Sequence, residues 1–240
     1  MPFTIHLNGI ASIFHERQLA VVADAASEDS QELAGLIGVL DLPTHCLGRQ
    51  NERLHMWKKH CMGQTGVEEV TGLPCSLIDL LSCAMDPGIE DRLLQWPGES
   101  GEPVMCKIWK ATQYAGLIMA RELQSNQGSP SSPCVQSTES VVQHVLLLMR
   151  DLRLRMDVDT FAATEAHLFP LVAAGSQSKA LSLDDRLFIR ECIVALSDNS
   201  LNNYPYYKGA MLALETYWAS DGVKSLDVVT RDLGLELGLF

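Results

Sequence analysis

A long helical pattern with an uncharged run of ten residues constrains the fold more than any other feature of this chain. Apolar residues recur every three or four positions within residues 103–123, at Val104, Ile108, Ala111, Ala115 and Ile118. This spacing places their side chains on one face of a helix. From Ala111 to Ala120 no charged residue occurs on any face. We therefore expect a central helix that is buried nearly all round, with other helices packed against it.

The rest of the chain also favours helices over strands. Apolar residues at helical spacing predict helices at about residues 3–15, 29–43, 72–85, 89–94, 141–152, 160–175, 183–196, 211–218 and 225–233. Residues 44–72 are irregular and predict a long connection with one short helix around Leu54 and Trp57. No segment alternates as strands do. We predict an all-α fold, an irregular bundle of roughly eight to ten helices.

Several helix ends are marked in the sequence. Thr71 is expected to cap the helix that follows it. Ser182 and Asp185 match a capping box at the start of another helix. Pro170 is expected to kink or end a helix, and Gly175 to close it.

One helical domain is expected over residues 1–240, because a chain of this length can bury a substantial core. The segment from Ser125 to Pro133 reads SNQGSPSSP, a composition typical of a flexible connection. We predict a flexible loop at residues 125–137. The helices on either side of it are too apolar to stand alone, so the loop is not expected to divide two domains.

Charge and hydropathy exclude several classes of protein. The net charge of −12, from 18 basic and 30 acidic residues, disfavours unaided binding to nucleic acid. No stretch approaches the roughly 18 consecutive apolar residues of a membrane span. The opening residues, MPFTIHLNGI, lack a secretory pattern. We expect no direct binding to nucleic acid, no membrane association, and a nuclear or cytoplasmic location.

The seven cysteines include no CxxC pair and lie mostly in apolar runs, which predicts reduced thiols that act as small core residues. One grouping has the residue types of a metal site, namely His45, Cys46, His55, His60 and Cys61. Its spacing is looser than that of zinc sites. We expect neither a metal nor another cofactor.

Short motifs follow one another along nearly the whole chain. They are His6–Ile10, Gly72–Pro74 with Leu77–Leu81, Leu93–Trp96, Ile108–Trp109 with Tyr114–Gly116, Phe169–Leu171 with Ala174–Gly175, Arg186 with Ile189, and Leu214 with Trp218. In order and spacing they resemble the regulatory (middle homology, or effector) domain of fungal zinc-cluster transcription factors. The cysteine-rich basic segment with which that family binds DNA has no counterpart here. The first match, at His6, resembles a point well inside the family's domain, so the sequence is expected to be either a fragment or a short free-standing relative.

The resemblance implies a helical domain that is often dimeric and that in some members binds an apolar small molecule, such as a sterol. We therefore expect an apolar small molecule as ligand, and a second copy or another protein as partner. Side chains that suit such a ligand are aromatic, contain sulfur, or are histidines on otherwise apolar helix faces. The candidates are Trp109, Tyr114, His144, Met149, His167, Tyr207 and Trp218. The alternative for each is an ordinary place in the core.

The sequence leaves open whether the chain is an enzyme and identifies no catalytic residue. The motifs GxSxG, GxxxxGK[ST], GxGxxG and HExxH are absent. The first hypothesis is a regulatory or small-molecule-sensing domain that does not bind DNA by itself. The second is a free-standing protein of natural-product biosynthesis, a cofactor-free cyclase, isomerase or pericyclase of the Diels–Alderase type. Such a protein can accelerate a reaction by positioning an apolar substrate in a helical pocket.

Overall fold

The fold was obtained as a computed structural model that describes residues 3–20, 28–126, 136–156, 165–199, 205–220 and 223–239. Within these ranges the chain forms eleven α-helices, ten of them with seven or more residues, and one sheet of two very short strands. The all-α prediction is confirmed. The helices are α1 (Phe3–Ala20), α2 (Glu28–Leu40), α3 (Met56–His60), α4 (Cys75–Ser82), α5 (Ile89–Gln95), α6 (Pro103–Asn126), α7 (Thr138–Arg155), α9 (Leu168–Gly175), α10 (Leu183–Asn199), α11 (Pro205–Ala219) and α12 (Leu226–Asp232).

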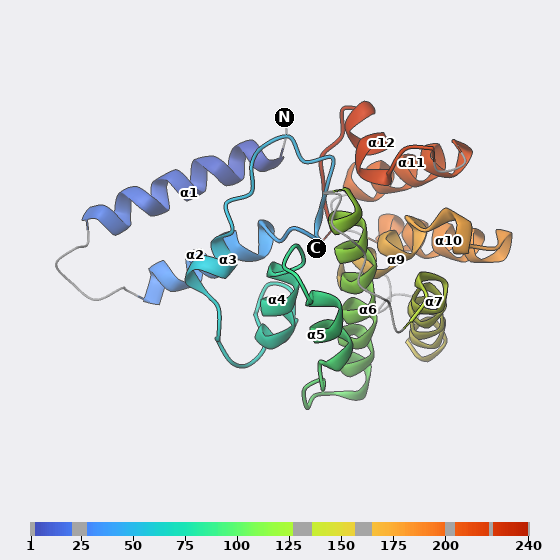
Figure 1. Cartoon of the computed structure of the whole chain (residues 1–240), viewed down its shortest axis with the longest axis horizontal. Helices are drawn as coiled ribbons and strands as arrows, with labels where there is room; N and C mark the ends of the chain where they lie inside the picture. The colour runs from blue at the N-terminus through green and yellow to red at the C-terminus, as the bar shows by residue number, and fades with distance from the viewer. Residues whose placement is uncertain are drawn as a thin grey trace.

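Helix α6 runs through the middle of the molecule, with α2–α5 on one side and α7 and α9–α12 on the other (Figure 1). It packs against α4, α5, α7 and α9. From Ala111 to Ala120 every side chain is buried except that of Tyr114, which is half-buried. The prediction of a central helix without a solvated face is therefore confirmed for residues 111–120.

Each of the four tryptophans connects two separate parts of the chain through a hydrogen bond of its indole N–H group. Each ring is buried, and each indole N–H donates a hydrogen bond to a different element, so no polar atom is lost when the ring is buried. The four bonds are Trp57 to Asp79 Oδ1 (2.7 Å), Trp96 to Ser76 Oγ (3.1 Å), Trp109 to the Gly72 carbonyl (2.7 Å) and Trp218 to the Gly175 carbonyl (2.8 Å).

A strand pair joins two segments that lie far apart in the sequence. Strand β1 (Cys46–Leu47) pairs antiparallel with β2 (Leu237–Gly238), and the Leu239 N–H donates to the His45 carbonyl at 2.9 Å. The sequence did not predict this sheet, because two residues are too few to show an alternating pattern. The pairing holds the connection after α2 against the segment after α12.

The capping box is confirmed, since the Asp185 N–H donates to Ser182 Oγ at 3.1 Å and the Ser182 N–H donates to Asp185 Oδ2 at 2.9 Å. The prediction for Thr71 is wrong. Helix α4 begins at Cys75 with no side-chain cap, and the Thr71 hydroxyl donates to Glu68 Oε2 at 2.6 Å. The Thr71 oxygen accepts a hydrogen bond from the Leu73 N–H at 3.3 Å, in the turn that precedes the helix.

Pro170 neither kinks nor ends a helix, so that prediction is also wrong. A short 3₁₀ turn, η1 (Glu165–His167), precedes α9, which begins at Leu168 and ends at Gly175 as expected. Pro170 therefore lies in the first turn of α9, where backbone N–H groups have no partner within the helix. Residues 160–164 of the predicted helix lie outside the described residues.

Most of the predicted loop at 125–137 also lies outside the described residues. Ser125 and Asn126 belong to the last turn of α6, so the loop begins later than expected, and residues 127–135 are not described. The single domain over residues 1–240 stays a prediction.

The six cysteines that the structure describes are free thiols, five of them buried and Cys106 half-buried. Burial raises the pKa of Cys46 to about 12, of Cys61 to about 11 and of Cys192 to about 12. These thiols are therefore protonated at neutral pH and unreactive, which agrees with the predicted core role.

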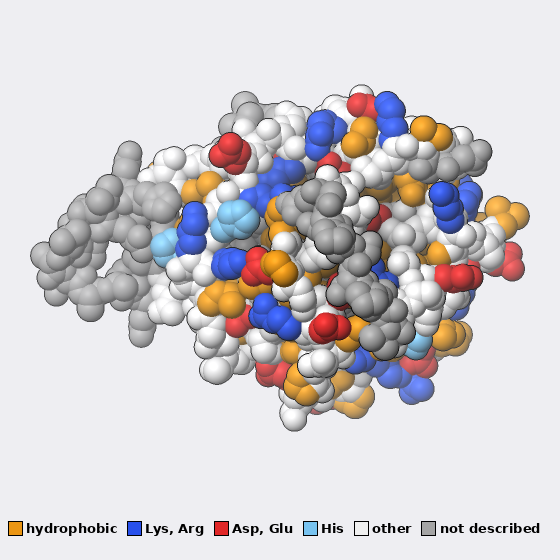
Figure 2. Space-filling model, in the orientation of Figure 1, with side chains coloured by type: hydrophobic (Ala, Val, Ile, Leu, Met, Phe, Trp, Pro, Cys, Tyr) orange, Lys and Arg blue, Asp and Glu red, His pale blue; other side chains and the backbone are white. Residues whose placement is uncertain are grey.

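None of the described helices has the length and apolar character that a membrane span requires. Basic and acidic side chains are interspersed over the described part of the face in Figure 2, so this face has no continuous basic surface.

Helix α2 offers a matched test of the packing. A Cβ atom on Gly38 would lie 2.9 Å from the backbone nitrogen of Trp57, whereas one on Gly35 would meet nothing within 4 Å. We expect Gly38→Ala to lower the free energy of unfolding by about 1–3 kcal/mol, because α2 and α3 must separate. Gly35→Ala should raise it by up to about 1 kcal/mol through higher helix propensity. Urea unfolding of both variants measures the two changes, and an equal effect of the two would contradict the close approach of α2 and α3.

Candidate functional site

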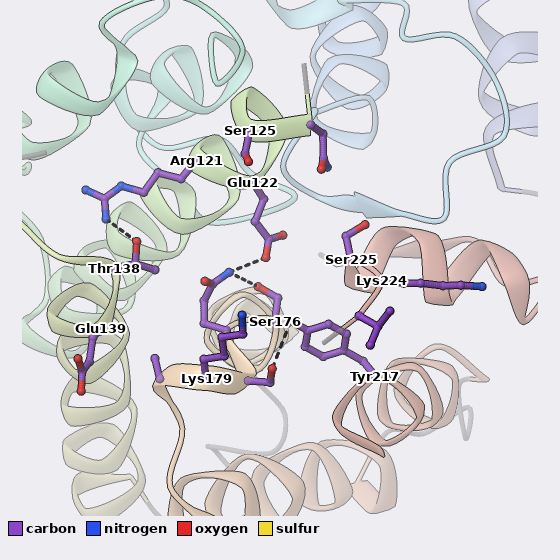
Figure 3. A pocket seen from close by; sticks show the side chains of 15 residues that line it. Arg121, Glu122, Ser125, Thr138, Glu139, Ser176, Lys179, Tyr217, Lys224 and Ser225 are labelled. Atoms are coloured by element: carbon purple, nitrogen blue, oxygen red, sulfur yellow. Dashed lines mark hydrogen bonds between the residues drawn. The ribbon is translucent and has the colours of Figure 1, made fainter. Parts of the chain in front are cut away.

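A pocket of about 610 Å³ opens beside the C-terminal end of α6 (Figure 3). Five parts of the chain line it: the last turns of α6, the start of α7, the end of α9 with the 3₁₀ turn η2 (Ser178–Ala180), α11, and the start of α12. This volume lies within the range of about 300–1,000 Å³ that is typical of small-molecule sites. The lining is largely polar and charged, with side chains such as Glu122, Ser176, Gln177, Tyr217 and Ser225, and Ala180 and Val223 are its apolar members.

Glu122 lines this pocket and also lies on the face of α6 that packs against the other helices. The apolar stripe at Val104, Ile108, Ala111, Ala115 and Ile118 continues, at the same spacing of three and four, to Glu122. The buried face of the helix therefore ends in a carboxyl group. The sequence analysis stopped at Ile118 and did not identify Glu122, although one further step along the stripe would have found it.

Glu122 is half-buried, and its carboxyl group lies against the residues that follow α9. Gln177 Nε2 donates to Glu122 Oε1 at 2.5 Å and also lies 3.1 Å from Ser176 Oγ. Burial is the main cause that raises the pKa of Glu122 to about 7, and the charge of Asp227 acts in the same direction. Hydrogen bonds from Ser176 and Gln177 act in the opposite direction. Near neutral pH the group therefore exists in both its protonated and its ionised form.

Hydrogen bonds fix the rim of the pocket. Arg121 Nε lies 2.9 Å from Glu90 Oε2 on α5, and Arg121 Nη1 donates to Thr138 Oγ1 on α7 at 3.2 Å. On the other side, the Ser178 hydroxyl lies 3.5 Å from the Tyr217 hydroxyl (Figure 3). The pocket is thus held between several elements.

A second, smaller hollow of about 180 Å³ shares Glu122 and Asn126 with the first. Its other lining side chains are apolar, contain sulfur or carry charge, and they are Pro43, Cys46, Leu47, Arg53, Met85, Met119, Leu123 and Asp227. Glu122 therefore lies between two spaces that a ligand could occupy.

The arrangement has definite chemical capabilities. A protonated Glu122 can donate a hydrogen bond to a carbonyl or ether oxygen, and the ionised form can accept one from an N–H or O–H group or pair with a cation. A carboxyl group with a pKa near the operating pH is also suited to general acid–base catalysis. Among the described residues no group of three or more histidine, cysteine, aspartate or glutamate side chains is arranged to hold a metal ion.

Two of the predicted site residues meet at the surface. The rings of Tyr114 on α6 and His144 on α7 lie 5.3 Å apart, and Lys110 Nζ lies 5.2 Å from the centre of the Tyr114 ring. His144 is exposed, so the apolar face expected around it is not what the structure has. Its Nδ1 lies 2.7 Å from the Ser140 carbonyl.

The other five predicted residues are buried at separate places. Trp109 and Trp218 form the indole hydrogen bonds described above, and the Arg186 guanidinium lies 5.7 Å from the centre of the Trp218 ring. Met149 on α7, His167 before α9 and Tyr207 on α11 are also buried. None of the seven is among the residues that line the two pockets. Tyr217, next to Trp218, is the aromatic residue that reaches the larger one.

The metal-like grouping of the sequence contains one deeply buried histidine. The His45 ring stacks on Phe169 with centroids 3.8 Å apart, and its Nδ1 lies 2.8 Å from Thr44 Oγ1. Burial lowers the pKa of His45 to about 3, so the ring is neutral at physiological pH. It acts as a packed core residue.

No protein-family model, curated protein or solved structure matches this chain. The functional argument therefore starts from the geometry around Glu122.

The burial of Glu122 predicts a pH-dependent stability. In the unfolded chain a glutamate has a pKa of about 4.3. Because the folded pKa is raised to about 7, this residue's contribution to stability is fully present below about pH 4.3 and is lost as the pH rises through 7. Glu122→Gln removes that loss. We expect its free energy of unfolding, relative to the wild type, to rise by on the order of 2 kcal/mol between pH 5 and pH 8.

Urea unfolding of both proteins at several pH values measures the difference. Glu102→Gln is the matched control, because Glu102 is exposed just before the other end of α6. Between pH 5 and pH 8 the Glu122→Gln difference should change more than the Glu102→Gln difference. A Glu122→Gln difference that stays constant with pH would contradict a raised pKa of Glu122.

Proposed function

We propose that this chain is a regulatory, small-molecule-sensing domain, related to the regulatory domain of fungal zinc-cluster transcription factors, and that it does not bind DNA by itself. The observation that carries the proposal is the half-buried Glu122 carboxyl group with its raised pKa, which faces a pocket of ligand size at the end of the central helix. Removal of a carboxyl group from water lowers the stability of the fold. A ligand that forms a hydrogen bond with Glu122 would give this residue a function that offsets the loss of stability.

The position of the pocket suits a sensor. Its walls come from segments that are far apart in the sequence, from Arg121 on α6 to Ser225 at the start of α12. A ligand that contacts all of them favours one relative arrangement of the helices over others, which is what a population shift requires. The expected ligand is a small molecule with an apolar part and several polar groups, one of which faces Glu122, because most of the side chains that line the pocket are polar or charged.

Two further observations agree with regulation through a partner protein. The net charge of −12 disfavours direct contact with nucleic acid. Leucines on α7 and α10 are exposed to solvent, with Leu154 at 85% and Leu183 at 81% of their full accessible area. Exposed apolar side chains of this size suit a contact with a second copy or another protein.

The acid–base character of Glu122 favours one alternative, a cofactor-free isomerase or cyclase of natural-product biosynthesis. A protonated Glu122 would give its proton to one atom of a bound substrate, and the resulting carboxylate would take a proton from another atom. The substrate is then isomerised, the carboxyl group is regenerated, and no redox partner is needed. A pericyclase would need only the shape of the pocket.

The proposal is tested with a small-molecule extract and a pocket-filling variant. Ser125 is exposed at the end of α6 and lines the larger pocket, so Ser125→Trp should fill its mouth. We expect an extract component at about 100 times its dissociation constant to raise the melting temperature of the wild type by roughly 5–10 °C. The variant should show a shift smaller by at least half. Ser100→Trp, at an exposed position away from the pocket, should respond like the wild type.

Mass spectrometry of the bound component separates the two functions. A sensor releases the ligand chemically unchanged, whereas an isomerase or cyclase converts many equivalents per chain, and Glu122→Gln stops the conversion. An extract that shifts the wild type and Ser125→Trp equally would contradict a ligand in this pocket.

A further inference from the structure

Arg53 lines the smaller hollow beside Glu122 and lies in the connection between β1 and α3. Its side chain is half-buried, and among the described residues its one hydrogen bond runs from Nη1 to Met85 Sδ at 3.4 Å. The Nε atom is shielded from solvent and makes no hydrogen bond within the described part of the chain. Sulfur is a weak acceptor, so this contact compensates little for the water that the guanidinium loses.

The carboxylates that could balance Arg53 already have other partners. Arg49 Nη2 lies 2.5 Å from Asp41 Oδ1. Asp227 accepts a hydrogen bond from the Gly48 N–H at 2.8 Å and pairs with Arg231 at 2.6 Å. Arg53 itself forms no ion pair with any described residue. Its pKa is lowered, first by burial and then by the charge of Arg49, while the charges of Asp227 and Asp41 act in the opposite direction.

Most of the other residues that line the hollow are apolar or contain sulfur, and the carboxyl groups of Glu122 and Asp227 line it as well. Leu47, Met119 and Leu123 provide hydrocarbon and thioether surface beside the guanidinium. The volume of about 180 Å³ is similar to that of an engineered cavity of roughly 150 Å³ that binds benzene in another protein. The space therefore suits a body of about one aromatic ring with an anionic group at one end.

We propose that this hollow binds a small organic carboxylic acid in its ionised form, with the carboxylate on Arg53 and the apolar body against Met119, Leu47 and Leu123. The inference rests on the proposed function and narrows the class of its ligand. An arginine fork matches the two oxygens of a carboxylate, and the pairing gains strength from the low polarity of the surrounding walls. Glu122, at the boundary with the larger pocket, accommodates the anion best when it is protonated.

A purely structural role for Arg53 makes a different prediction. If the guanidinium served only to stabilise the fold, Arg53→Met would lower the melting temperature of the chain and would not discriminate between an anionic and a neutral ligand. If it is kept for an anion, the same substitution removes a poorly compensated charge. The melting temperature of the unliganded protein should then stay the same or rise.

The test uses 4-fluorobenzoate and its neutral analogue 4-fluorobenzamide as probes, followed by ¹⁹F NMR at pH 6 with the full chain. We expect the benzoate to bind the wild type with a dissociation constant of about 1 mM or below, which is reasonable for a ligand of this size. The amide should bind at least tenfold more weakly. Arg53→Met should lose at least tenfold in benzoate affinity, and Arg53→Lys should retain part of it. Arg92→Met, which removes an exposed arginine of α5, should bind like the wild type.

The inference is overturned if the amide binds as well as the acid, if Arg53→Met binds benzoate as well as the wild type, or if the wild type binds no benzoate. The comparison of acid and amide on the wild type decides the matter even if Arg53→Met fails to fold. If an extract component binds, Ser125→Trp blocks it and benzoate does not bind, the proposed function stands and this inference is overturned. If benzoate binds through Arg53 but no extract component raises the melting temperature, this inference stands and the proposed function is overturned.

Discussion

The uncharged segment of α6, residues 111–120, must be shielded from solvent on every side, and the neighbouring helices provide this shielding. Helices α4, α5, α7 and α9 pack around it, and the indole hydrogen bonds of the tryptophans connect several of these elements. Burial of alanine and isoleucine side chains stabilises the fold. At Glu122 the same buried stripe meets a carboxyl group, whose burial is tolerated only through protonation and through hydrogen bonds from the end of α9. The site is therefore a consequence of how the central helix is buried.

Features set by local pattern could be predicted from the sequence. The helical spacing on α6, the capping box at Ser182 and the apolar settings of the cysteines each depend on neighbours within a few positions. Features set by distant partners could not. The pairing of Cys46 with Gly238 leaves no pattern in either segment, and the hydrogen bonds of Glu122 come from Ser176 and Gln177, which follow α9 and lie far from Glu122 in the sequence. Extension of the α6 stripe by one position would still have marked Glu122 as unusual.

The motifs that carry the family resemblance lie in the scaffold and not in the pocket. The Gly72 carbonyl accepts a hydrogen bond from the indole N–H of Trp109, and the Gly175 carbonyl accepts one from the indole N–H of Trp218. The Trp218 ring also lies near the Arg186 guanidinium. Glu122, Arg53 and Tyr217 belong to none of these motifs. A scaffold held by such contacts can keep its shape while the residues around the pockets change, so ligand preference can be altered without loss of the fold.

The most direct measurement is the pKa of Glu122 in the folded chain. The side-chain carboxyl carbon can be followed by ¹³C NMR as the pH is varied, with Glu122→Gln used to assign the signal. A buried acid at the end of the central helix predicts a midpoint near 7. A midpoint near 4.3, the ordinary value for a glutamate in water, would contradict it.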